Sequence, residues 1–109
     1  MRRCMIIMMG ALLALFSCGS GDRHPKPFLE EPQMIDVLTD VYLLEAQLNV
    51  MKSEDNDVSE LQRVYYDQLF EHYGITDSIF ELNMAYYTRH PSTLERVMDS
   101  VTNRFLKMQ

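Results

Sequence analysis

Apolar residues recur at spacings of three and four along four stretches of the chain after residue 30, which is the pattern of amphipathic helices. The stretches predict helices over about residues 32–52, 58 or 59 to 73, 77–89 and 93–108. No stretch shows the sustained alternation of apolar and polar residues that is typical of a half-buried strand. We therefore expect an all-α domain, built as a small bundle or an open array of about four helices with short connections.

Residues with strong local preferences mark the ends of these helices. Pro32 suits the opening turn of the first helix, because its missing amide needs no partner there. Gly74 is a natural left-handed stop after the second helix, and Thr76 or Asp77 is expected to cap the third. Residues 92–95 (Ser-Thr-Leu-Glu) have the pattern of a capping box, in which serine and glutamate satisfy each other's free backbone amides. The fourth helix is therefore expected to begin just after the serine.

Two pairs of adjacent tyrosines stand out on the second and third helices. The predicted inner face of the second helix comprises Leu61, Val64, Tyr65, Leu69 and Tyr73. Neighbouring residues point about 100° apart on a helix, so Tyr65 and Tyr87 are expected in the core. Tyr66 and Tyr86 are then nearer the surface and are the candidate partner-binding residues. The alternative is that all the tyrosines fill a thin core, with their hydroxyl groups at the water edge.

The N-terminal residues have the three parts of a secretory leader. Two arginines precede an apolar run of about 13 residues, whereas a permanent transmembrane helix takes about 20. Residues 15–18 (Leu-Phe-Ser-Cys) resemble the lipobox of bacterial lipoproteins, whose cysteine thiol receives a lipid before a peptidase cuts in front of it. The resemblance implies a signal peptide at residues 1–17, peptidase recognition at Leu15 and Ser17, and lipidation of Cys18. The alternative is a soluble secreted protein in which this cysteine occurs by chance.

The next segment separates the leader from the predicted helices. Residues 18–29 are rich in glycine, proline and polar side chains, which favours a lipidated tether in front of a helical domain at residues 30–109. The segment lacks the acidic run that sends some lipoproteins to the outer surface. We therefore expect a protein anchored by lipid to a membrane of the cell envelope, most simply the outer membrane, with its domain facing the periplasm.

Charge and candidate chemistry narrow the classes of function. The chain has 16 acidic and 10 basic residues, and loss of the leader with its two arginines leaves a net charge of −8, which disfavours nucleic-acid binding. Neither a metal site nor a cofactor is expected, because the three histidines are scattered and both cysteines lie at or before the expected cleavage point. Asp36, Asp40 and Glu45 are candidates for a carboxylate site that binds a cation or transfers protons. The alternative is that they are solvated helix charges, with Glu45 paired to an arginine.

Three stretches of the predicted domain carry a family resemblance. They are residues 34–40 with Glu45 and Ala46; Tyr66, Leu69, Phe70, residues 73–76 and Phe80; and Tyr86, Tyr87 and Pro91. Over residues 30–105 the chain resembles domain-of-unknown-function family 4296, a family of small bacterial lipoproteins. It departs from the family at Asn83, where we would expect serine. The resemblance implies a lipoprotein with a compact helical domain, and it supplies no activity.

These observations favour a membrane-anchored, non-enzymatic module that binds a protein or peptide in the bacterial envelope through a groove between helices. The alternative is a permanent structural subunit of a larger envelope complex. An enzyme or a metal-binding protein is the third hypothesis, and no catalytic motif in the sequence supports it.

Overall fold

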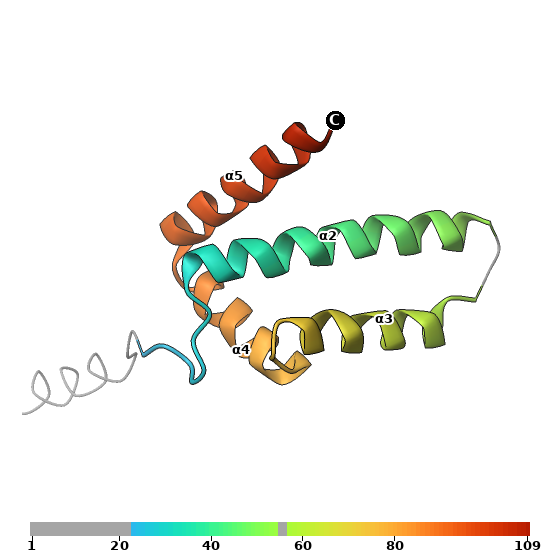
Figure 1. Cartoon of the computed structure of the whole chain (residues 1–109). Coiled ribbons are helices and arrows are strands. Elements are labelled where there is room, and N and C mark those ends of the chain that lie inside the picture. Colours follow the sequence, from blue (N-terminus) through green and yellow to red (C-terminus); the bar gives the residue numbers. More distant parts are fainter. Residues whose placement is uncertain (1–22, 55–56) are drawn as a thin grey trace, which may run out of the picture.

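The part of the chain that the structure describes folds into four helices (Figure 1). The computed structural model describes residues 23–54 and 57–109, so the predictions for Leu15, Ser17 and Cys18 lie outside the described residues. The helices are α2 (Glu31–Ser53), α3 (Ser59–His72), α4 (Asp77–Thr88) and α5 (Pro91–Met108). The all-α prediction is confirmed, and each predicted helix end lies within two residues of the observed one.

Helix α2 is the centre of the arrangement (Figure 1). Helix α3 runs back along one side of it, α5 lies on the other side, and α4 leads from the end of α3 to the start of α5. On the α5 side, the rings of Tyr42 and Phe105 meet edge to face with centroids 6.4 Å apart, and Arg104 forms an ion pair with Asp36. Apolar residues therefore occur on more than one face of α2, since two helices pack against it.

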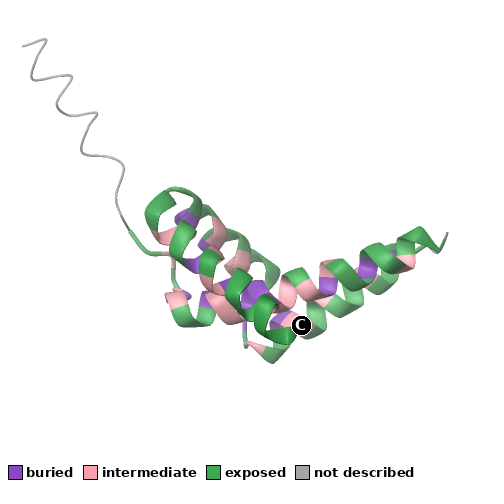
Figure 2. Ribbon diagram, turned by 90° about the horizontal axis from the view of Figure 1, so that it is seen from above, coloured by how far each residue is buried: buried purple, intermediate pink, exposed green. Residues whose placement is uncertain are grey.

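The core has two parts, and its buried positions are marked in Figure 2. The main cluster draws on the N-terminal segment and all four helices, with buried members Leu29, Met34, Val37, Leu38, Phe70, Ile75, Tyr86, Tyr87, Val97 and Val101. A smaller cluster near the far end of the α2–α3 hairpin contains Leu44, Leu48 and Val58. The far end of the hairpin thus rests on contacts between two helices, whereas the other end is covered by α4 and α5.

The observed helix ends agree with all but one of the predicted signals. Gly74 has φ +68° and stops α3, and the Thr76 hydroxyl accepts a hydrogen bond from the Ile79 amide at 3.3 Å. The capping box predicted at residues 92–95 is wrong. Helix α5 begins at Pro91, and its N-cap His90 makes no side-chain capping bond. Proline at the first position has no amide to satisfy and a φ already suited to a helix, so Ser92 lies within the first turn.

The inner face of α3 lies about a quarter turn from the predicted one. Leu61, Val64 and Tyr65, predicted to be inside, are 37%, 38% and 36% exposed. Phe70 is buried, and Tyr66, predicted nearer the surface, is half-buried against the core. The predictions for Tyr65 and Tyr66 are therefore wrong. Leu69 and Tyr73, which were also predicted to be inside, do pack against the core, and the aromatic rings of Tyr66 and Phe70 complete the buried face.

The segment before α2 is packed into the domain. Leu29 is 1% exposed; its amide donates to Asn83 Oδ1 at 2.8 Å, and its carbonyl accepts from the Tyr87 hydroxyl at 2.6 Å. Asn83 Nδ2 also donates to the carbonyls of Pro27 at 3.1 Å and Ile79 at 2.8 Å. Residues 27–29, assigned by sequence to the tether, are thus held by two side chains of α4.

Candidate protein-interaction surfaces

Tyr66 joins α3 to α2 through its hydroxyl group. The hydroxyl donates a hydrogen bond to the Glu45 carboxylate, and the ring packs against both core clusters. Burial and then this hydrogen bond raise the pKa of Tyr66 above its ordinary value. The alternative in which Glu45 pairs with an arginine is wrong, because its carboxylate accepts from the tyrosine instead. Tyr66 therefore has a structural role, because it links α3 to α2.

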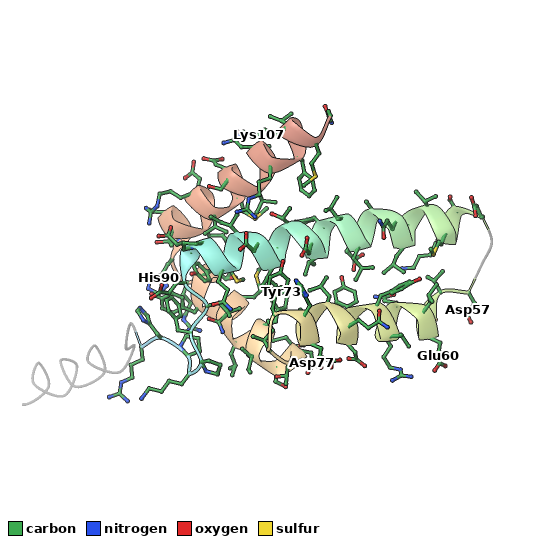
Figure 3. The ribbon with its side chains drawn as sticks, in the orientation of Figure 1. Asp57, Glu60, Tyr73, Asp77, His90 and Lys107 are labelled. Carbon is green, nitrogen blue, oxygen red and sulfur yellow. The ribbon has the colours of Figure 1, made fainter. Side chains whose placement is uncertain are left out.

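Tyr73 makes a second link of the same kind (Figure 3). Its hydroxyl donates to the Asp40 carboxylate and lies 3.3 Å from the Asp36 carbonyl oxygen, while the Asp36 carboxylate binds Arg104. All three candidate carboxylates of α2 therefore have a structural partner. Within residues 23–54 and 57–109, no group of three histidine, cysteine or acidic side chains is placed to hold a metal ion.

Tyr86 lies in an aromatic cluster at the other end of the domain. Tyr86 is 9% exposed, and its ring stacks on that of His90 with centroids 4.3 Å apart. It also meets the rings of Phe28 and His24 edge to face, with centroid distances of 5.1 and 4.9 Å. The prediction that Tyr86 lies nearer the surface is wrong. The cluster borders a cavity of about 380 Å³ that also touches Arg96. Little of the Tyr86 ring is left for a partner to contact.

The first candidate surface is the α2–α3 face. It consists of a groove of about 350 Å³ and an exposed apolar stripe beside it on α3. The groove is lined by Asp40, Leu43, Leu44, Gln47, Tyr65, Gln68, Leu69, His72 and Tyr73, and the stripe is Leu61, Val64 and Tyr65. Helix α3 thus has apolar residues on two faces, and only one of them is buried by the rest of the domain.

The second candidate surface is the α3–α4 groove, of about 340 Å³. Three aromatic side chains form its floor, Tyr66, Phe70 and Phe80. Four charged side chains form its rim, Arg63, Asp67, Asp77 and Glu81. Tyr66 therefore reaches one of the candidate surfaces, while Tyr86 borders a different cavity, so the two predicted partner-binding tyrosines do not form one site.

Sequence reasoning missed two features of these surfaces. Asn83 is fully buried, and its position between Phe80 and Tyr87 on one helix face was the available signal. The second missed feature is the exposed stripe on α3 (Leu61, Val64 and Tyr65), which the sequence prediction placed on the inner face. The available signal was that Tyr66 and Phe70, four residues apart, form a second apolar stripe beside the predicted one.

Comparison with known proteins gives a family and no activity. A family model described as "Domain of unknown function (DUF4296)" matches residues 25–109. No curated protein and no solved structure matches the chain. Among the residues that the structure describes, no helix is long and apolar enough to cross a membrane.

Proposed function

The chain belongs to the DUF4296 family, whose description assigns no function, and we propose that it is a lipid-anchored, non-enzymatic interaction module of the bacterial envelope. In this proposal Cys18 carries the lipid and the α2–α3 face binds a helix of another envelope protein. The sequence features that support the anchor are the short apolar leader and the Leu-Phe-Ser-Cys ending at residues 15–18.

The observation that carries the binding proposal is the exposed apolar stripe on α3. Leu61, Val64 and Tyr65 follow the helical spacing of three and four, and each is more than a third exposed. Single exposed apolar residues are ordinary on a protein surface, whereas a continuous stripe beside a groove is typical of a docking site. A stripe and groove that both run along α3 fit an amphipathic helix, laid with its apolar side down.

Charge favours a different protein over a second copy of this chain. The mature chain carries a net charge of −8, so two copies repel each other as they approach. The groove also presents the amides Gln47 and Gln68, which can bond polar groups at the edge of a partner helix. The partner that fits best is therefore a helix with one apolar side and a neutral or basic flank.

Site-specific photo-crosslinking in intact cells tests the docking surface. A photo-crosslinking amino acid in place of Val64 should give one main protein adduct, whose cross-linked residue lies on the apolar side of a helix. The same amino acid in place of Asn103, which is exposed on α5, is the matched control and should not give that adduct. Equal adducts from both positions, or a cross-linked residue in a disordered segment, would contradict the proposal.

The anchor is tested separately. The variant Cys18→Ser should remain an uncleaved precursor and should not incorporate labelled fatty acid, because the thiol that accepts the lipid is missing. Cys4→Ser, which removes the other cysteine, is the control and should be processed normally. Mature protein of normal size from Cys18→Ser would show that lipidation is not required and would remove the lipoprotein part of the proposal.

A further inference from the structure

We infer that the α3–α4 groove binds an arginine- or lysine-bearing segment of a partner protein. The aliphatic stem of the basic side chain lies on the aromatic floor, and its cationic head reaches the carboxylates of Asp77 and Glu81. This groove lies on a different side of α3 from the α2–α3 face. The inference therefore stands or fails independently of the proposed helix-binding surface.

The floor of the groove is made of rings in contact. The Phe70 ring centroid lies 5.1 Å from that of Phe80 and 5.8 Å from that of Tyr66. Phe70 is 5% exposed, but Tyr66 and Phe80 are half-buried, so both keep part of their surface open to the groove. An open aromatic surface attracts a cation as well as an apolar chain, because the face of each ring carries partial negative charge.

The rim of the groove has unbalanced negative charge. Its one cation, Arg63, already binds Glu60 at 2.9 Å and lies 3.9 Å from Asp67. Among residues 23–54 and 57–109, neither Asp77 nor Glu81 has a basic side chain within ion-pair distance. Figure 3 shows Asp77 and Glu60 on the side of the domain turned away from α2, with no helix beyond them.

The combination of floor and rim selects the class of ligand. Phosphate-bearing ligands are repelled by the three rim carboxylates. A metal ion needs several ligands around it, and among the described residues no three histidine, cysteine or acidic side chains are placed to supply them. Arginine and lysine match both parts, since each has an apolar stem and a cationic head. In a segment that alternates basic and apolar residues, the stem of a basic side chain would lie on the aromatic rings, and the neighbouring apolar residues would contact the rest of the groove.

Fluorescence anisotropy with the full-length chain in a mild non-ionic detergent tests the inference. The probe is a short fluorescein-labelled peptide of alternating arginine and leucine, and the control peptide has glutamate in place of arginine. Only the basic peptide should bind, and added salt should weaken it by screening the rim charges. Equal binding of both peptides would mean a purely apolar contact and would overturn the inference.

Charge reversal assigns the binding to this groove. Glu81→Lys should weaken binding of the basic peptide about tenfold, since it replaces an attraction at the rim with a repulsion. The matched control is Glu95→Lys on α5, which makes the same change in net charge on an exposed residue outside the groove. An unchanged affinity in Glu81→Lys, or an equal loss in Glu95→Lys, would overturn the assignment.

Two further measurements keep that result interpretable. Glu81 is exposed, so Glu81→Lys should melt at the same temperature as the unaltered chain. Val64→Ser, on the α2–α3 face, should leave binding of the basic peptide unchanged. If Val64→Ser lowers the affinity for the basic peptide as much as Glu81→Lys does, the peptide binds to the α2–α3 face and the α3–α4 groove is not its site.

Discussion

The side chain of Asn83 accepts a hydrogen bond from the backbone amide of Leu29 at 2.8 Å, although the two residues are 54 positions apart. Tyr87, one turn further along α4, donates to the carbonyl of Leu29 at 2.6 Å. Both backbone polar groups of a buried residue outside any helix are therefore satisfied by side chains. Because buried backbone groups nearly always need partners, α4 is what allows the chain before α2 to enter the core.

Asn83→Ala should lower the free energy of unfolding by about 2 kcal/mol, since it leaves the buried Leu29 amide without an acceptor. Urea denaturation measures this loss. Asn83→Ser, the residue expected from the family, should lose less, because a hydroxyl can still accept one bond. Asn103→Ala on the exposed side of α5 is the control and should change stability little. An equal effect at the two asparagines would contradict the role given to Asn83.

Gly74→Ala should destabilise the domain by about 1–2 kcal/mol, because a residue with a Cβ is strained at φ +68°. No atom lies within 4 Å of the position that a Cβ would take, so the cost comes from the backbone and not from a clash. Gly74→Asn should therefore cost less than Gly74→Ala, since asparagine tolerates the left-handed conformation. Thermal unfolding of the two variants decides the order, and equal melting temperatures would contradict a strained turn.

The two tyrosines of α3 should respond to truncation in the order opposite to the sequence prediction. Tyr66→Ala should cost about 3 kcal/mol, because it removes a ring packed against both core clusters and leaves Glu45 without its donor. Tyr65→Ala should cost less than about 1 kcal/mol, because its ring lies on the exposed stripe. Chemical denaturation compares them, and a larger loss for Tyr65→Ala would restore the predicted face.

Alkaline pH should weaken the fold through its buried tyrosines. Burial raises the pKa of Tyr87 from its ordinary value of 10.0 to about 12, and it also raises the pKa of Tyr66 and Tyr73. A tyrosine whose pKa is higher in the folded state than in the unfolded state stabilises the fold fully at pH values below the unfolded-state pKa. This stabilisation is lost as the pH rises through the folded-state pKa. Stability should therefore hold up to about pH 10 and fall between about pH 10 and 12.

Circular dichroism followed with increasing pH measures this loss. Tyr87→Phe should start with lower stability at neutral pH, because the Leu29 carbonyl loses its donor, and should then show a shallower alkaline decline. Tyr42→Phe is the control, since Tyr42 is 44% exposed. A decline as steep in Tyr87→Phe as in the unaltered chain would show that Tyr87 does not contribute to it.

The helix boundaries were predictable because they depend on local signals. Pro32, Gly74 and Thr76 act through their own backbone geometry or a bond to a near neighbour, so no knowledge of distant residues is needed. The predicted capping box at residues 92–95 was wrong because a second local signal competes with it. Two start signals lay side by side, and proline at the first position of α5 took precedence over serine at the second.

The faces of the helices were less predictable, because they are decided by tertiary contacts. On α3, both the exposed stripe and the buried aromatic residues follow the helical spacing. The contacts of α3 with α2 and α4, such as Tyr66 with Glu45 and Phe70 with Phe80, decide which of them is buried. The pairing of Glu45 with Tyr66, 21 residues away, has no local signal at all. The exposed stripe and the α3–α4 groove both follow from the orientation of α3, so sequence spacing alone placed neither surface.

The hydrogen bonds from α4 to Leu29 also determine when the segment before α2 can pack during synthesis. Leu29 leaves the ribosome 54 residues before Asn83, which is roughly 3–10 s at the usual rate of elongation. Until α4 has formed, the amide and carbonyl of Leu29 lack their native partners, so the segment before α2 cannot make its native contacts with the core. Residues 27–29 can therefore take their native place against α4 only after the chain has been made as far as Tyr87.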